Sequence, residues 1–137
     1  MKIFLDANIL VAVLNKEYPV FPYAARLLSL NGNKKDKIVT SSICLAIAYY
    51  FAEKKHGYEL AKQKIHLLSQ NIGIVECSEK EVKSALANKK INDFEDGLEY
   101  YAALNAKCNC IVSEDVKDFY FSELEVLTSE NFLKKYF

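Results

Sequence analysis

The sequence predicts an α/β fold in which three layers, α/β/α, are built around a mostly parallel sheet of four or five strands. Short apolar segments that suit buried strands alternate along the chain with amphipathic segments that suit helices. Strands separated by helices form βαβ units, whose parallel sheets are covered by helices on both faces. The chain has 137 residues and is 51% hydrophobic, so residues 1–137 are expected to form a single domain.

Capping or breaking residues mark the ends of several expected helices. Ser41 or Ser42 caps one helix, and Gly57 follows its end. Ser78 and Glu81 have the spacing of a capping box at the start of another. The apolar runs between helices predict strands over residues 3–5, 37–40, 72–77, 110–112 and 126–127. Helices are expected over residues 9–14, 23–30, 43–55, 59–70, 79–88, 94–107 and 129–136.

Charge and composition argue against several classes of protein. Lys and Arg total 18, as do Asp and Glu, so the zero net charge disfavours a protein that coats nucleic acid through a strongly basic surface. No apolar run approaches the roughly 20 residues of a membrane span, and the first residues do not follow a secretory signal pattern. We therefore predict a cytoplasmic protein with no membrane association.

The four cysteines are expected to be free thiols in a reducing cytosol, because no CxxC pair occurs among them. The alternative is a zinc site built from Cys108, Cys110 and a histidine. Neither His56 nor His66 has the usual spacing for such a site.

Two aspartates follow apolar strands. Asp6 comes directly after the strand over residues 3–5, and Asp115 closely follows the strand over residues 110–112. In parallel sheets, ligands bind outside the carboxyl ends of the strands. Either aspartate alone is as readily explained as a helix cap or a turn residue. Together they favour a functional site at one edge of the sheet.

A further acidic group lies in the stretch INDFEDGLEYYAAL, which starts at Ile91. Asp93 and Asp96 are three residues apart and so share one side of a helix, in a first turn where the helix dipole stabilises carboxylates. Glu95 is about 160° from Asp93 around a helix axis, so we do not expect it in the same cluster. Asp118 is interpreted as an ordinary turn residue.

Asp6, Asp96 and Asp115 are thus expected to meet at one edge of the sheet. Carboxylates crowded together without Lys or Arg partners repel one another, and a divalent cation removes that repulsion. Ligand sets made only of oxygen suit Mg²⁺ or Mn²⁺ better than zinc. Such a site can polarise a phosphoryl oxygen and activate a water for attack on a phosphodiester.

Four motifs, in order along the chain, carry a resemblance to a known family. They are FLDANIL with its Asp-x-Asn, DFEDGLEYYAAL, CIVSEDVKDF and VLTSENFL. In these stretches the sequence resembles the PIN domain family of metal-dependent ribonucleases, which includes the toxins of the VapBC toxin–antitoxin class. The resemblance covers nearly the whole chain and implies a single PIN-like nuclease domain over residues 1–137.

The resemblance implies roles for particular residues. Three carboxylates would be catalytic and would coordinate Mg²⁺ or Mn²⁺: Asp6, Asp96 and Asp115. Asp93 would be an additional catalytic acid beside them. Asn8 and Ser113 would be substrate-binding residues. Asn8 would hold the Asp6 loop through hydrogen bonds, and Ser113 would bind a metal-bound water or a substrate phosphate.

One position departs from the family pattern. Most members carry a glutamate early in the helix after the second strand, and the matching residue here is Ile47, within SSICLAIAYYFAEKK. Glu53 lies six residues further on, roughly 9 Å along a helix axis, and does not simply take that place. We therefore expect either a weaker metal site or compensation by Asp93.

The resemblance implies an Mg²⁺- or Mn²⁺-dependent endoribonuclease that hydrolyses RNA phosphodiesters with a metal-activated water. By family analogy it would be the toxin of a type II toxin–antitoxin pair, with RNA and a cognate antitoxin as partners. The alternative is a catalytically weak or inactive PIN-fold module that binds RNA or protein, which Ile47 motivates. A phosphatase of the haloacid dehalogenase type fits less well, because the second acid of its Asp-x-Asp motif is Asn8 here.

Two further features bear on partners. The segment over residues 43–51 is apolar nearly all round, so it is either part of the core or the contact of a homodimer. Lys89 and Lys90 directly precede the acidic helix and are candidates for phosphate contacts, although such lysines are usually no more than solvated surface.

Overall fold

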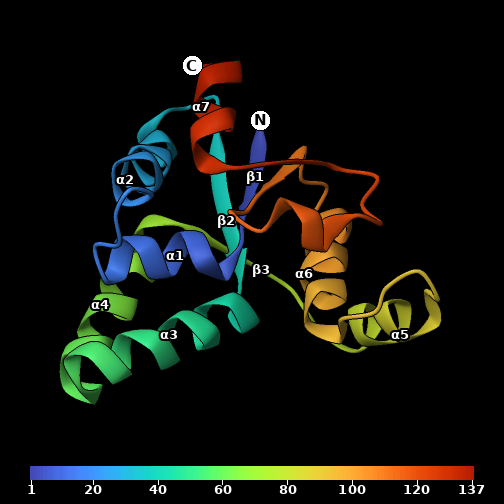
Figure 1. Ribbon diagram of the computed structural model, residues 1–137, viewed down its shortest axis with the longest axis horizontal. Helices are drawn as coiled ribbons and strands as arrows, with labels where there is room; N and C mark the ends of the chain where they lie inside the picture. The colour runs from blue at the N-terminus through green and yellow to red at the C-terminus, as the bar shows by residue number, and fades with distance from the viewer.

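Five parallel strands form the central sheet of the computed structural model, which describes residues 1–137 (Figure 1). The order across the sheet is β3-β2-β1-β4-β5, and every neighbouring pair is parallel. The predicted three-layer α/β fold is confirmed, with five strands rather than four. The strands are β1 (Lys2–Leu5), β2 (Lys37–Ser41), β3 (Gly73–Val75), β4 (Cys110–Val112) and β5 (Glu125–Leu127).

Helices cover both faces of the sheet. In Figure 1 the strands run through the middle, with α1, α2 and α4 on the left and α5 and α6 on the right. None of the helices has both the length and the hydropathy needed to cross a lipid bilayer. The helices are α1 (Ala7–Leu14), α2 (Phe21–Ser29), α3 (Ser42–His56), α4 (Tyr58–Asn71), α5 (Glu79–Ala87), α6 (Phe94–Asn105) and α7 (Ser129–Tyr136), with short 3₁₀ turns η1 (Leu30–Gly32) and η2 (Val116–Phe119).

Strand β1 lies at the centre of the sheet and of the core. Ile3, Phe4 and Leu5 have no exposed surface and belong to a single cluster of 29 buried hydrophobic residues. A short, continuous apolar run suits this place because the strand is covered on both faces. Each fully buried side chain of this size contributes roughly 1.5–3 kcal/mol to stability.

The chain reverses its direction of winding between β1 and β4. From β1 the chain passes through α1 and α2 to β2, whereas it enters β4 from α6 on the other side. The two strands pair in register, Leu5 opposite Val112, so Asp6 and Ser113 leave the sheet side by side. In parallel α/β sheets this reversal is where ligands bind.

Helix α6 packs tightly against α5 through Gly97. A Cβ at this position would lie 3.0 Å from Ala85 Cβ and 3.0 Å from Ile91 Cγ2. Only glycine fits such a close approach without moving its neighbours. This contact fixes the position of the helix that carries Asp96.

Two features differ from the sequence-based expectation. Strand β3 spans only Gly73–Val75, because it is an edge strand that pairs with three residues of β2. Helix α3 is not buried all round: Cys44, Leu45, Ala48 and Ala52 are buried, but Tyr50 and Phe51 are about half exposed. A homodimer contact on this helix stays a prediction.

Candidate active site

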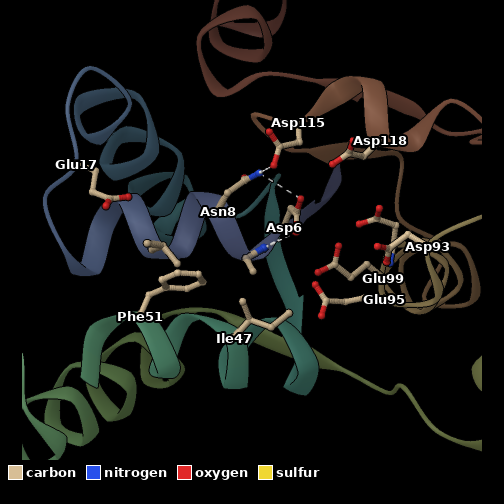
Figure 2. Close-up of a pocket in the computed structure, with 13 residues that line it drawn as sticks. Asp6, Asn8, Glu17, Ile47, Phe51, Asp93, Glu95, Glu99, Asp115 and Asp118 are labelled. Atoms are coloured by element: carbon tan, nitrogen blue, oxygen red, sulfur yellow. Dashed lines mark hydrogen bonds between the residues drawn. The ribbon is translucent and has the colours of Figure 1, made fainter. Parts of the chain in front are cut away.

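A hollow of about 430 Å³ opens at the carboxyl ends of β1 and β4 (Figure 2). Acidic side chains dominate its lining, and no Lys, Arg or His contributes to it. The remaining lining residues are Asn8 and an apolar group on α1 and α3. The acidic residues are Asp6, Glu17, Asp93, Glu95, Asp96, Glu99, Asp115 and Asp118, and the apolar ones are Ala7, Val11, Ile47 and Phe51.

Asp6 stands at the junction between β1 and α1, where it is the N-cap of the helix. Its Oδ1 accepts a hydrogen bond from the Ala7 amide at 2.6 Å, and its Oδ2 accepts one from Ser113 Oγ at 2.6 Å. The side chain is almost buried, with 7% of the residue exposed. The capping role and a place in the site are therefore not alternatives, because Asp6 has both.

Asn8 connects the loop after β1 to the loop after β4. Its Nδ2 lies 3.2 Å from Asp115 Oδ2 and 3.4 Å from Asp6 Oδ2, and its Oδ1 accepts a hydrogen bond from the Glu114 amide at 3.2 Å. An amide side chain suits this position because it can donate and accept at the same time. The two aspartates are thereby held facing one hollow.

Ser113 lies beneath the two aspartates and is fully buried. Its hydroxyl donates to Asp6 and accepts a hydrogen bond from the Asp115 amide at 3.0 Å. This geometry favours an orienting role for Ser113. The predicted contact with a metal-bound water or a phosphate has no support from the position of this hydroxyl, which lies away from solvent.

Asp93 and Asp96 bring the start of α6 to the hollow. Asp93 is the N-cap, and its Oδ1 accepts a hydrogen bond from the Asp96 amide at 3.1 Å. Partial burial, followed by the negative charges of Asp93, Asp118 and Asp6, raises the pKa of Asp96 to about 7. Asp96 is therefore partly protonated near neutral pH when no cation is nearby.

Glu95 lines the hollow, so the expectation that it lies outside the cluster was wrong. The expectation was based on the angle between Glu95 and Asp93 around a helix axis, as if both residues were helical. Asp93 has extended backbone angles, φ −100° and ψ 117°, and the helix begins only at Phe94. Burial and the charges of Asp93 and Asp6 raise the pKa of Glu95.

Glu99 is an acidic residue of the hollow that the sequence analysis missed. It is only 2% exposed, and Cys44 Sγ donates a hydrogen bond to its Oε1 at 3.1 Å. Burial and the neighbouring Asp6 raise the pKa of Glu99 to about 10. The signal that could have found it is its spacing: it follows Asp96 by three residues, on the same side of the helix.

Asp118 also lines the hollow rather than serving only as a turn residue, and its charge contributes to the raised pKa of Asp96. The spacing from Asp115 to Asp118 spans one turn of η2.

Ile47 and Phe51 face the hollow from α3, across from the acids (Figure 2). No carboxylate on α3 takes part, as the sequence predicts.

Lys89 and Lys90 are exposed in the loop before α6 and do not line the hollow. Their contact with phosphate stays a prediction.

All four cysteines are free thiols, as expected, and Cys108 and Cys110 join no group of metal-ligating side chains.

The donor set of the hollow fits a divalent cation that prefers oxygen. Asp6 and Glu99 bring carboxylate oxygens within 4.8 Å of each other and of Cys44 Sγ, in a buried place. Buried carboxylates are costly without a compensating positive charge, and the lining supplies none. Mg²⁺ and Mn²⁺ are the cations such ligands favour.

A sequence model of the PIN domain family matches residues 2–117, most of the chain. The chain belongs to the PIN domain family. This confirms the family that the resemblance of its motifs indicated.

A curated relative and several solved structures extend the comparison. The protein described as Ribonuclease VapC1 from Aquifex aeolicus (strain VF5) is 28% identical over 142 residues, which cover 98% of this chain and 95% of that protein. VapBC2 from Rickettsia felis, solved bound to a DNA fragment from its promoter, matches with a TM-score of 0.70 and 23% identity over 93% of this chain and 97% of that chain. VapBC-1 from nontypeable Haemophilus influenzae matches with a TM-score of 0.69 and 20% identity over 95% of this chain and 99% of that chain. At these identities the two structures establish the fold alone.

Proposed function

We propose that residues 1–137 form a single PIN nuclease domain that hydrolyses RNA phosphodiesters with the help of Mg²⁺ or Mn²⁺. The observation that carries the proposal is the placement of Asp6, Asp96 and Asp115 around one hollow that has no basic residue. The relative described as a ribonuclease, which aligns with nearly the whole chain, supports the same chemistry.

Asp6, Asp96 and Asp115 would hold the cation, with Asp93 beside them. A bound Mg²⁺ or Mn²⁺ supplies a Lewis acid for the phosphoryl oxygen and lowers the pKa of a water. The chain's part is to keep the carboxylates in place. Asn8 fixes the two loops against each other, and Ser113 orients Asp6.

The apolar wall of the hollow gives a nucleotide a second surface. Phe51 is 45% exposed and lines the hollow together with Ile47 and Val11. An exposed aromatic ring can stack on an unpaired base. We therefore expect the base next to the scissile phosphate to lie toward α3, while the phosphate faces the acids.

Cleavage of RNA by the purified protein tests the proposal. Activity should require Mn²⁺ or Mg²⁺, should disappear with a chelator, and should be lost in Asp115→Asn. The matched control is Glu130→Gln, which removes one carboxylate from α7, outside the hollow. RNA cleavage that persists in the chelator would contradict metal dependence.

An antitoxin is the proposed protein partner. The support is that two structural neighbours were solved as VapBC assemblies and a third as a toxin–antitoxin complex from Klebsiella pneumoniae. A short gene directly beside this one should encode a protein that copurifies with the chain and suppresses its RNA cleavage. A neighbouring product that neither binds nor inhibits the chain would count against a toxin role.

A binding module with weak or no catalysis is the second candidate. Ile47 motivates it, because an apolar side chain occupies the α3 side of the site. The same assays separate the two candidates. A protein that binds RNA but leaves it intact with both cations would favour the binding module.

A further inference from the structure

Glu99 is a deeply buried acid with no basic partner. It is 2% exposed and lies on the same side of α6 as Asp96. No Lys, Arg or His lines the hollow around it. An acid in such a place is costly unless a proton, a cation or hydrogen-bond donors compensate its charge.

Hydrogen-bond donors compensate only one side of this carboxyl group. Cys44 Sγ donates to Oε1 at 3.1 Å, and the only other side chain within hydrogen-bonding reach is that of Asp6, itself an acid. A second acid lies beside it, since ligand atoms of Asp6, Cys44 and Glu99 all lie within 4.8 Å of one another. Figure 2 shows the Glu99 carboxyl group directed into the hollow, on the Asp6 side.

We infer that Glu99 is a direct ligand of the divalent cation, shared with Asp6. The inference rests on the proposed metal-dependent function and adds a carboxylate that none of the motifs predicts. Ile47 leaves the α3 side of the hollow without an acid, and Glu99 supplies one from the α6 side. A cation between the two buried carboxylates satisfies both, because Mg²⁺ and Mn²⁺ accept several carboxylate oxygens in one coordination sphere.

A purely structural Glu99 would behave differently. In that case Asp6 and Glu99 share a proton, and the cation binds without Glu99. Glu99→Gln keeps the size of the side chain and supplies an amide donor for Asp6, so it preserves the structural role and removes only the charged ligand.

Calorimetric titration with Mn²⁺ distinguishes the two roles. The variants are Glu99→Gln and, as a matched control, Glu95→Gln, which removes the same charge from an exposed acid of the same helix and hollow. We expect Glu99→Gln to weaken Mn²⁺ binding at least about 10-fold more than the control does. Equal affinities of the two variants would overturn the inference.

Crystals of the unmodified protein soaked in Mn²⁺ provide a test that needs no substitution. An anomalous peak within about 2.5 Å of a Glu99 oxygen would support direct coordination. A peak held by Asp6 and Asp96 but out of reach of Glu99 would overturn it, even if Glu99→Gln did not fold.

RNA cleavage by the unmodified protein separates this inference from the proposed function. If Mn²⁺ binds through Glu99 but no RNA is cut, the nuclease proposal fails and the ligand assignment stands. If RNA is cut with Mn²⁺ while Glu99→Gln binds Mn²⁺ as Glu95→Gln does, the nuclease proposal stands and the ligand assignment fails.

Discussion

The two halves of the acidic hollow are stabilised in different ways. The half after β1 and β4 is held by hydrogen-bond donors: Ala7, Ser113 and Asn8 all donate to Asp6, and Asn8 also reaches Asp115. The half on α6 has few donors, and there Asp96 and Glu99 have raised pKa values. The first half is preorganised by the chain, whereas the second needs a positive charge from outside.

This difference explains why two neighbouring groups of carboxylates can coexist in one hollow. Hydrogen-bond donors orient the first group without a cation. The second group can hold protons until a cation binds, so the metal-free protein avoids the full repulsion between these carboxylates. Four substitutions and two conditions, pH and Mn²⁺, test the comparison, beginning with the largest expected effect.

Asp6→Asn should remove most RNA cleavage, because Asp6 contacts both halves of the hollow. We expect a loss of at least about 100-fold in kcat/KM, together with weaker Mn²⁺ binding. Cleavage rates and calorimetry measure these effects. Activity that survives this substitution would refute the assignment of Asp6.

Asn8→Ala should have a smaller effect, because it removes the bridge and leaves every carboxylate in place. We expect kcat/KM for RNA cleavage to fall about 10- to 100-fold, as for other side chains that orient metal ligands. The measurement is cleavage at saturating Mn²⁺, with circular dichroism as the control for folding. An unchanged rate would mean that the bridge between the two loops is not needed.

Stability of the metal-free protein should fall as the pH rises from about 4 toward 8. The pKa of Asp96 is raised from 3.8 to about 7, so between these values the folded state binds a proton that the unfolded state has lost. That proton stabilises the fold at low pH, and the gain is lost as the pH passes about 7. Tm measured in a chelator should therefore decrease over this range.

Two further measurements isolate the part of this pH dependence that is due to Asp96. Asp96→Asn should reduce the decrease in Tm, because it removes one titrating group, while the decrease due to Glu99, whose pKa is raised to about 10, should remain. Mn²⁺ should raise Tm more at pH 8 than at pH 6, since the cation competes with the proton. A Tm profile identical in Asp96→Asn and the unmodified protein would contradict the role of Asp96.

Glu130→Gln should have the smallest effect. Glu130 is a partly exposed acid that already has a basic partner, Lys134, at 2.9 Å on α7. Exposed ion pairs contribute little, so Tm should stay within about 2 °C of the unmodified protein. A larger change would show that acids outside the hollow also carry substantial energy and would weaken the contrast.

The sequence predicted the fold and much of the site from short-range patterns. Apolar runs separated by helices are enough to specify parallel strands; Asp6 directly follows one of them and Asp115 closely follows another. The carboxyl ends of parallel strands meet at one edge, so these acids could be placed together without a structure. Ile47 was likewise identified as the position on α3 that lacks an acid.

Glu99 and Glu95 show where this reasoning stops. Glu99 lies in an otherwise apolar stretch, and its environment depends on Cys44 from α3 and Asp6 from β1, which are distant in sequence. Glu95 was misplaced because its angle was measured from Asp93 as if Asp93 were part of the helix, whereas Asp93 is the extended N-cap. One residue at a helix boundary changes the direction of every side chain measured from it.

The amino-acid sequence by itself determined which segments form buried strands and which acids follow them, because both depend on the local order of residues. Only the tertiary structure decided which carboxylates have donors and which do not. That property arises from packing α6 against β2, β4 and η2, which brings Glu99 next to Cys44 and Asp6 and sets the burial and the distances between charges. Asp6 could be predicted at the site from the local order of residues, whereas Glu99 could be identified only from the packing in the tertiary structure.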